Sequence, residues 1–151
     1  MMRRRRDEGF SLIELMMVIA VIGILVTVLI PQFGDVKSAA KITGVENNVR
    51  SVVITISGMS STEDIDDSLG TTMSSMKNPI TNETGVGTSA PSNRTQTKAV
   101  YVFYDSSTTW TNNSLYNGAV VVYAHSDFSA DVFAIDEQGH SISDLHSKVD
   151  R

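Results

Sequence analysis

GFSLIELMMVIAVIGILVTVLIP, residues 9–31, is the stretch that decides how this chain is organised. From residue 10 to residue 30 nearly every side chain is apolar, and the exceptions are Ser11, Glu14, Gly23 and Thr27. A helix of this length is about 30 Å long, which matches the hydrocarbon core of a bilayer. The sequence therefore predicts a transmembrane helix over residues 10–31.

Glu14 is the ionisable residue inside this apolar run. A carboxylate at membrane depth costs about 2.5–3.5 kcal/mol on insertion scales, so such a residue usually has a partner and a task. The run offers no cation, and the nearest ones are Arg3 to Arg6 in the basic head of the chain. Glu14 is therefore a candidate functional residue, and the alternative is a tolerated polar residue that snorkels to the interface.

Residues 1–9, MMRRRRDEG, form a short basic leader. The positive-inside rule keeps this end in the cytoplasm and sends the C-terminal part across the membrane. The leader does not belong to an ordinary secretory signal, because the apolar run is too long and no small-x-small cleavage site follows it. The whole chain carries a formal net charge of −5 despite this leader, so binding of nucleic acid through the acidic C-terminal part is not expected.

The order of residues around Gly9 resembles the N-terminus of the type IV pilin and type II secretion pseudopilin family, whose precursors carry a class III signal peptide. Basic residues precede Gly9 and Phe10, a hydroxyl residue and two aliphatic residues lead to Glu14, and an apolar helix ends at Pro31. The resemblance extends from Gly9 to Phe33, in GFSLIEL and IPQF. It fades along the next helix and is only architectural beyond about residue 60.

The resemblance implies a role for each residue of the motif. A prepilin peptidase would cut between Gly9 and Phe10 and methylate the new amine of Phe10, and Glu14 would pair with the Phe10 amine of a neighbouring subunit. An α-amino group is mostly charged at neutral pH, and burying a carboxylate against it recovers Coulomb energy. Each subunit would carry one amine and one carboxylate, so the pairing passes head to tail and builds an open helical polymer.

Gly23 and Pro31 are the weak points of the apolar helix. Glycine costs up to about 1 kcal/mol in a helix interior, and proline removes a backbone hydrogen bond. We expect Pro31 to kink the helix at the membrane surface. The family resemblance implies, in addition, that the segment between the two residues loses helical order when subunits pack into a fibre.

Residues 32–58 change to an amphipathic pattern. Apolar residues recur mostly three or four positions apart: Phe33, Val36, Ala40, Val45, Val49, Val52, Val53 and Ile56. This spacing predicts a helix with one apolar stripe, which extends the first helix into a spine of roughly 45 residues. Gly58 and the polar cluster after it end the spine.

Residues 59–97 are rich in Ser, Thr, Asn and Gly and are predicted to be a variable loop region. TEDIDDSL, residues 62–69, favours a short helix with Thr62 as its N-cap. The remainder, from residue 78, is expected to be a long irregular connection.

Residues 98–151 are predicted to form an antiparallel sheet and a C-terminal tail. The stretches 98–105, 118–125 and 129–136 are β-branched and aromatic, and HSISD at 140–144 is a short last strand. An apolar face of this sheet would pack on the stripe of the spine. The fold class is α+β, a long helix with a sheet laid across its outer half.

No catalytic or metal-binding pattern is apparent, so an enzyme, a cofactor and a metal are not expected. The chain contains no cysteine and its histidines are His125, His140 and His146. His140 and His146 lack metal-ligand spacing and are expected to be exposed in turns. The acids near the turns are expected to be solvated, since no EF-hand pattern is present: Asp127, Asp131, Asp136 and Glu137.

The leading functional hypothesis is a structural subunit of a type IV pilus. It would start as a single-pass precursor in the cytoplasmic (inner) membrane and end in an extracellular homopolymer. Its partners would be the prepilin peptidase and methyltransferase, an assembly platform protein and a cytoplasmic ATPase. One alternative is a pseudopilin of a type II secretion or competence system. Another is a single-span membrane protein with an extracytoplasmic binding head that is never cleaved.

Overall fold

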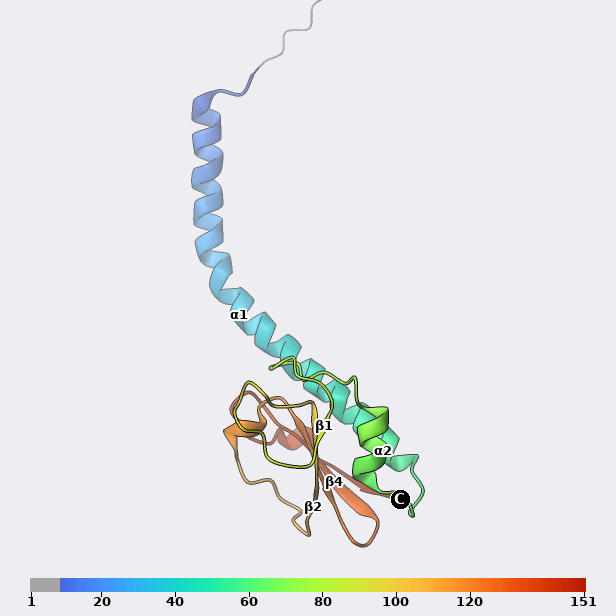
Figure 1. The fold of residues 1–151 in the computed structure, drawn as a ribbon. Coiled ribbons are helices and arrows are strands. Elements are labelled where there is room, and N and C mark those ends of the chain that lie inside the picture. Colours follow the sequence, from blue (N-terminus) through green and yellow to red (C-terminus); the bar gives the residue numbers. More distant parts are fainter. Residues whose placement is uncertain (1–8) are drawn as a thin grey trace, which may run out of the picture. The chain divides into compact units, whose positions relative to one another are not determined.

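The computed structural model describes residues 9–151, so the predicted basic residues Arg3 to Arg6 lie outside the described part of the chain. The chain divides into an N-terminal unit that ends at Ser38 and a C-terminal unit from Ala39 to Arg151, here called the head. Figure 1 traces the elements of both units along the sequence.

Helix α1 spans Leu12–Ser57, 46 residues, and confirms the predicted spine as one helix. It stops before Gly58, whose backbone N–H donates to the Ile54 carbonyl at 3.1 Å. The β-branched run near its end stays helical, because its apolar residues keep a spacing of three to four positions.

The segment Leu12–Ile30 of α1 is long and apolar enough to span a membrane, and none of it is buried inside the described part of the chain. The interior of the helix pairs its own backbone groups, and the Thr27 hydroxyl donates to the Ile24 carbonyl at 2.7 Å. Most of the backbone groups of the apolar segment are therefore paired, and the exceptions are the first N–H groups of the helix and the Thr27 carbonyl, for which Pro31 supplies no N–H.

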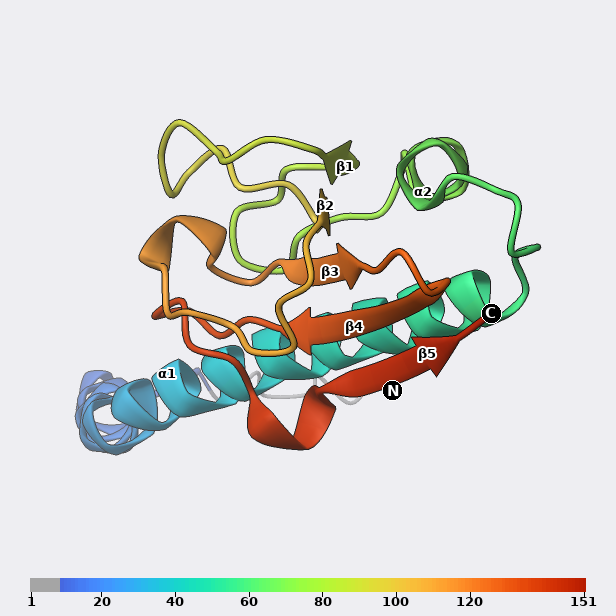
Figure 2. The ribbon, with the colours of Figure 1, turned by 90° about the horizontal axis from the view of Figure 1, so that it is seen from below.

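The head contains a five-stranded sheet in the order β1-β2-β3-β4-β5, beside the C-terminal half of α1 (Figure 2). The strands are β1 Val86–Gly87, β2 Val100–Tyr104, β3 Val120–Ala124, β4 Ser129–Ala134 and β5 Ser147–Asp150. The remaining elements are helix α2, Ile65–Thr72, and the short 3-10 helices η1, Ser114–Tyr116, and η2, Ser143–Leu145. The α+β class is as predicted.

The prediction of an all-antiparallel sheet is wrong. Strands β3, β4 and β5 pair antiparallel, but β1–β2 and β2–β3 pair parallel. Parallel neighbours need a crossover of about a dozen residues or more. The stretch 105–119 between β2 and β3 is long enough for such a crossover, and it contains η1.

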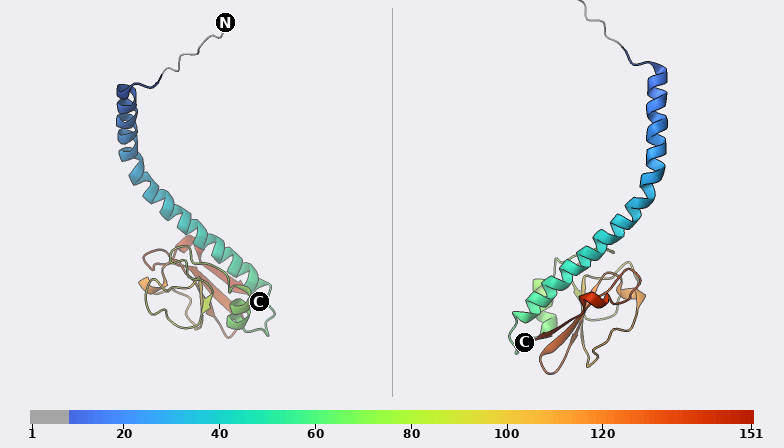
Figure 3. Two further views of the ribbon diagram at one scale, coloured as in Figure 1. Left: turned by 45° about the horizontal axis from the view of Figure 1, so that its top comes forward. Right: turned by 180° about the vertical axis from the view of Figure 1, so that it is seen from behind.

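The last strand also lies later than predicted. Residues 140–144 form only an isolated bridge, between Ser141 and Ile135. The cause is the turn before them: the Asp136 carboxylate accepts from the backbone N–H of Gln138 at 2.8 Å and of His140 at 2.9 Å. The chain re-enters the sheet at β5, and its end lies beside the end of α1 in both views of Figure 3.

Helix α2 exists as predicted, but it begins at Ile65 rather than after Thr62. Its N-cap is Asp64, which makes no side-chain capping bond, and the Thr62 hydroxyl lies 3.1 Å from that of Ser60. Ile65 and Leu69 are buried in the core. The start of α2 therefore follows the packing of its apolar face, with no help from a capping side chain.

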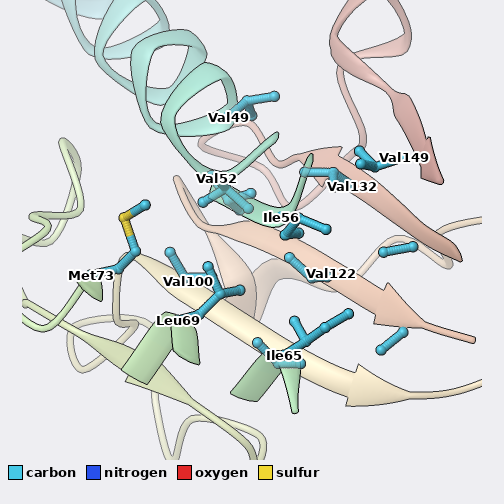
Figure 4. Close-up of a cluster of buried hydrophobic side chains, with 14 of the residues drawn as sticks. Val49, Val52, Ile56, Ile65, Leu69, Met73, Val100, Val122, Val132 and Val149 are labelled. Atoms are coloured by element: carbon cyan, nitrogen blue, oxygen red, sulfur yellow. The ribbon is translucent and has the colours of Figure 1, made fainter. Parts of the chain in front are cut away.

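The main core lies between α1, α2 and one face of the sheet (Figure 4). Val49, Val52 and Ile56 of α1 meet alternate residues of the strands, such as Val122 and Val132. Each fully buried residue of this size contributes about 1.5–3 kcal/mol. The predicted stripe is thus buried at Val45, Val49, Val52 and Ile56 and half-buried at Val53, whereas its earlier members Phe33, Val36 and Ala40 are exposed.

The predicted irregular stretch from residue 78 is anchored by the side chain of Asn78, which is fully buried. Its amide nitrogen lies 3.0–3.2 Å from the carbonyls of Thr97, Lys98 and Asn117, and its oxygen accepts from Ile80 N–H at 2.8 Å. The stretch is not wholly irregular as predicted, because it also contains strand β1, which pairs with β2, and an isolated bridge between Lys77 and Thr84.

Candidate functional site

Gly9 and Phe10 form an accessible junction before α1. Neither belongs to a helix or strand, and the Phe10 side chain is 83% exposed. No heavy atom of the described residues lies within 4 Å of the position a Gly9 Cβ would take. An enzyme that cuts at this junction would meet bare backbone in the position predicted for the cleavage.

Ser11 and Glu14 form a reciprocal capping box at the start of α1. The Ser11 backbone N–H donates to Glu14 Oε2 at 2.8 Å, and the Glu14 backbone N–H donates to Ser11 Oγ at 3.3 Å. This contact satisfies two donors that a helix N-terminus otherwise leaves unpaired. This contact was not predicted, although its sequence signal, S-x-x-E before an apolar run, is present in residues 11–14.

The capping box gives the Glu14 carboxylate a hydrogen-bond donor but no counter-charge. Its oxygen has a hydrogen-bond donor in its own chain and lies at the helix end where the dipole favours negative charge. The donor is a neutral N–H, however, and no salt bridge within residues 9–151 involves Glu14. The carboxylate is thus hydrogen-bonded and oriented, and its charge is not neutralised by a cation in the described structure.

Gly23 lies within the apolar half of α1, and no heavy atom approaches within 4 Å of its Cβ position. The described chain therefore does not need a glycine there for its own packing. Pro31 lies within the continuous span of α1. The roles predicted for these two residues, a kink and local melting in a fibre, stay predictions.

A second polar cluster lies on the sheet. Asp131 of β4 is 2% exposed, and its two carboxylate oxygens lie 2.8 Å from His125 Nε2 and 2.7 Å from His146 Nε2. The prediction of a solvated Asp131 is wrong, because the pairing of β3, β4 and β5 brings both imidazoles over it. The His146 ring also stacks on Phe133, with centroids 4.6 Å apart.

This cluster is a structural hydrogen-bond network. Each imidazole turns its Nε2 atom to the carboxylate, and residues 9–151 contain no group of three or more His, Cys, Asp or Glu arranged to hold a metal ion. The predicted exposure of His140 and His146 agrees with the structure. His125 is half-buried and closes the network from the β3–β4 turn.

Comparison with known proteins identifies the same N-terminal region. Residues 4–30 match the family model described as the prokaryotic N-terminal methylation motif. The chain is 35% identical over 51 residues to the type II secretion system core protein G of Pseudomonas aeruginosa. That match covers 34% of this chain and 36% of the relative, so the aligned part is about a third of the relative's length. No solved structure matches the chain.

These matches confirm the resemblance read from residues 9–33. The N-terminal segment carries the methylation motif, and the similarity to a pseudopilin supports the type IV pilin and pseudopilin class. Proteins of this class are structural subunits, and the apolar helix with its motif indicates a membrane-anchored precursor. The class is common to several assembly systems, and the matches do not distinguish between them.

Proposed function

We propose that this protein is the subunit of a helical filament. Its precursor is anchored in the membrane by α1, cleaved between Gly9 and Phe10, N-methylated at Phe10 and then polymerised. The observation that carries the proposal is the exposed apolar segment Leu12–Ile30, none of which is buried in its own chain. A patch of this size is not stable in water, so lipid covers it before assembly and neighbouring copies cover it afterwards.

Glu14 makes the packing of neighbouring copies in the filament specific. Its charge has no cationic partner within residues 9–151, and cleavage creates one new amine per subunit, on Phe10. Pairing the carboxylate with a neighbour's amine removes the penalty of burying each charge alone. Because each subunit carries one amine and one carboxylate, a head-to-tail pairing leaves an unpaired group at each end of the growing assembly, and the contact propagates as an open helix.

The partners follow from this path. A prepilin peptidase and methyltransferase would act on the exposed junction, and an assembly platform protein with a cytoplasmic ATPase would move the subunit out of the membrane. The leading destination is an extracellular type IV pilus. Its acidic head is not expected to bind nucleic acid by phosphate neutralisation.

A pseudopilin of a secretion system is the second candidate, and the similarity to core protein G favours it. The two candidates differ in the length and place of the filament. Electron microscopy of a deletion strain separates them: loss of long surface appendages supports the pilus. Intact appendages with accumulation of secreted proteins inside the cell support the pseudopilin.

The charge pairing is tested by Glu14→Gln beside Ser11→Ala. Glutamine keeps an oxygen that accepts from Ser11 N–H, so the capping box survives while the charge is lost. Ser11→Ala removes the hydroxyl acceptor and keeps the charge. We expect Glu14→Gln to be cleaved and to accumulate in membranes, with sheared filaments reduced at least about tenfold, because a few kcal/mol is lost at every joint.

Ser11→Ala should still assemble, since capping alone is worth only about 1 kcal/mol. Filament yield is read as the ratio of sheared filament protein to mature protein in membranes. Normal filaments from Glu14→Gln would reject the pairing. Equal losses from both variants would show that the capping geometry, rather than the charge, controls assembly.

A further inference from the structure

The sheet of the head has a second apolar face, opposite the core. Residues that alternate with the core positions along the strands, such as Tyr101, Val121 and Phe133, form a separate buried cluster. Phe103, Trp110 and Tyr123 are half-buried against it. The stretch between β2 and β3 passes over this face, and a hollow of about 460 Å³ lies there.

Aromatic rings form most of the wall of this hollow. Trp110 is the sole tryptophan of the chain. Its ring packs edge to face against that of Tyr116, with centroids 5.2 Å apart, and its centroid lies 6.4 Å from that of the Tyr123 ring. Phe103 extends this aromatic wall, with its ring centroid 6.3 Å from that of Tyr123. Such clusters are stabilised by ring contacts, so the rings are held as a preformed surface.

The wall is fixed at its outer edge by the turn at Gly139. Trp110 Nε1–H and the Asn113 backbone N–H both donate to the Gly139 carbonyl, at 2.9 and 3.0 Å. Gly139 has a φ of 91°, and a side chain there would overlap the Asn113 backbone. Two hydrogen bonds and a close backbone approach thus hold the tryptophan ring in place.

Residues that line the same hollow carry polar groups without hydrogen-bond partners among the described residues. Tyr116 is only 6% exposed, yet its hydroxyl makes no hydrogen bond to any described residue. Every fully buried side-chain oxygen or nitrogen in the described part has a partner, so this unpartnered hydroxyl is not fully buried, and Tyr116 is one of the residues that line the hollow. Tyrosine hydroxyls are protonated at neutral pH, and burial raises the pKa of Tyr116 and of Tyr123 further, so both hydroxyls are able to donate.

The charge of the hollow narrows the class of ligand. Asp105 is the charged residue in its lining, and no cation lines it. A phosphate or carboxylate ligand would meet no counter-charge there. The amide of Asn112, which has no side-chain hydrogen bond within residues 9–151, and the hydroxyl of Thr111 add neutral donors and acceptors.

We propose that this hollow binds a neutral saccharide, with a sugar face packed on Trp110 and Tyr123 and sugar hydroxyls bonded to Tyr116 and Asn112. Sugars present apolar C–H faces edged with hydroxyl groups, and this combination fits aromatic walls that carry a few unpaired neutral polar groups. The site is independent of the assembly motif, since none of its residues belongs to α1.

The sole tryptophan makes the test direct. The full chain, held in a detergent without a sugar headgroup, is titrated with cellobiose and with maltose while Trp110 fluorescence is recorded. We expect a saturable change with at least one disaccharide. Tyr116→Phe removes only a hydroxyl without a protein partner, so the fold is kept and affinity should fall roughly fivefold.

Tyr123→Ala should lower affinity about tenfold or more, because it removes a stacking face. Phe128→Ala is the matched control: Phe128 is also an exposed aromatic of the head, 50% exposed, but it lies outside this hollow, so binding should be unchanged. The absence of a saturable change with either sugar, or full affinity in Tyr116→Phe, overturns the proposal. N-acetyl-leucinamide is titrated in the same way as a probe for an apolar protein side chain. A saturable fluorescence change with this amide and none with either sugar would assign the hollow to an apolar side chain of a protein partner instead.

Discussion

The two halves of helix α1 both contain many aliphatic residues, but they meet opposite surroundings. From Leu12 to Ile30 apolar residues surround the helix on all sides, and none of this segment is buried. From Val45 to Ile56 most of them form one stripe that is buried under the sheet, and Ile54 lies off this stripe and is exposed. The comparison shows that the periodicity of an apolar run, rather than its hydrophobicity, indicates whether its own chain will cover it.

The two halves of α1 therefore contribute to different things: one to the stability of the head and the other to contacts outside the chain. The buried stripe contributes to the free energy of folding of the head, because its burial is complete within one chain. The exposed half contributes nothing comparable to the isolated chain. Its apolar surface is available to lipid and to other copies, and that is the property a filament subunit needs.

The largest effect is expected for a charge placed in the buried half. Val52→Asp introduces an unpaired carboxylate at a fully buried position and should destabilise the head by several kcal/mol, enough to abolish its cooperative unfolding transition. Ile54→Asp is the control, since Ile54 is 72% exposed on the same helix and its change should stay within about 0.5 kcal/mol. Thermal unfolding is followed by near-ultraviolet circular dichroism. Equal melting of both variants would contradict the assignment of the buried stripe.

A smaller effect should come from the glycines of α1. A Cβ on Gly44 would lie 2.7 and 2.9 Å from the Cγ and Cβ of Pro79, so Gly44→Ala should overpack this contact by about 1–3 kcal/mol, partly offset by about 1 kcal/mol of helix propensity. Gly34 has no heavy atom within 4 Å of its Cβ position, and Gly34→Ala should leave the unfolding of the head unchanged. Chemical denaturation of the two variants gives the comparison. Destabilisation by Gly34→Ala would show that the head extends further toward the N-terminus than Ala39.

The smallest effect is expected for the ion pair near the start of the packed half. Lys41 Nζ lies 2.7 Å from Glu137 Oε1, and both side chains are about a quarter exposed. Lys41→Ala should cost about 0.5–1 kcal/mol in low salt and less in high salt, because solvent ions screen the pair. Arg50→Ala removes the more exposed pair with Glu46 and should cost less. A salt-independent loss in Lys41→Ala would assign the effect to packing of the lysine stem instead.

Much of the fold follows from local pattern. Spacing and Gly58 predict the extent of α1, and β-branched runs predict β2, β3 and β4, because these signals are contained in single segments. The direction in which two strands pair is not a property of either segment alone. Whether β2 and β3 pair parallel depends on the path of residues 105–119, and the periodicity of apolar residues does not predict that path. The last strand was misplaced for a similar reason, since the Asp136 turn consumes the residues predicted to pair.

The residues of the candidate sites also fall into those that a single segment predicts and those that only the fold brings together. Glu14 and the Gly9-Phe10 junction stand out in one short motif, and the capping box was readable from Ser11 and Glu14. The burial of Asp131 was not readable, because its partners come from two other segments of the sheet. The aromatic hollow was missed too, since Trp110 and Tyr123 become neighbours only through the crossover.

The mass of the native N-terminus tests most directly whether the exposed half of α1 belongs to a processed filament subunit. Protein isolated from the cell surface is digested, and its N-terminal peptide is identified by mass spectrometry. We predict a peptide that begins at Phe10 and carries a methyl group on its amine. A surface-exposed protein that still begins at Met1 or Met2 would contradict the filament and leave α1 as a plain membrane anchor.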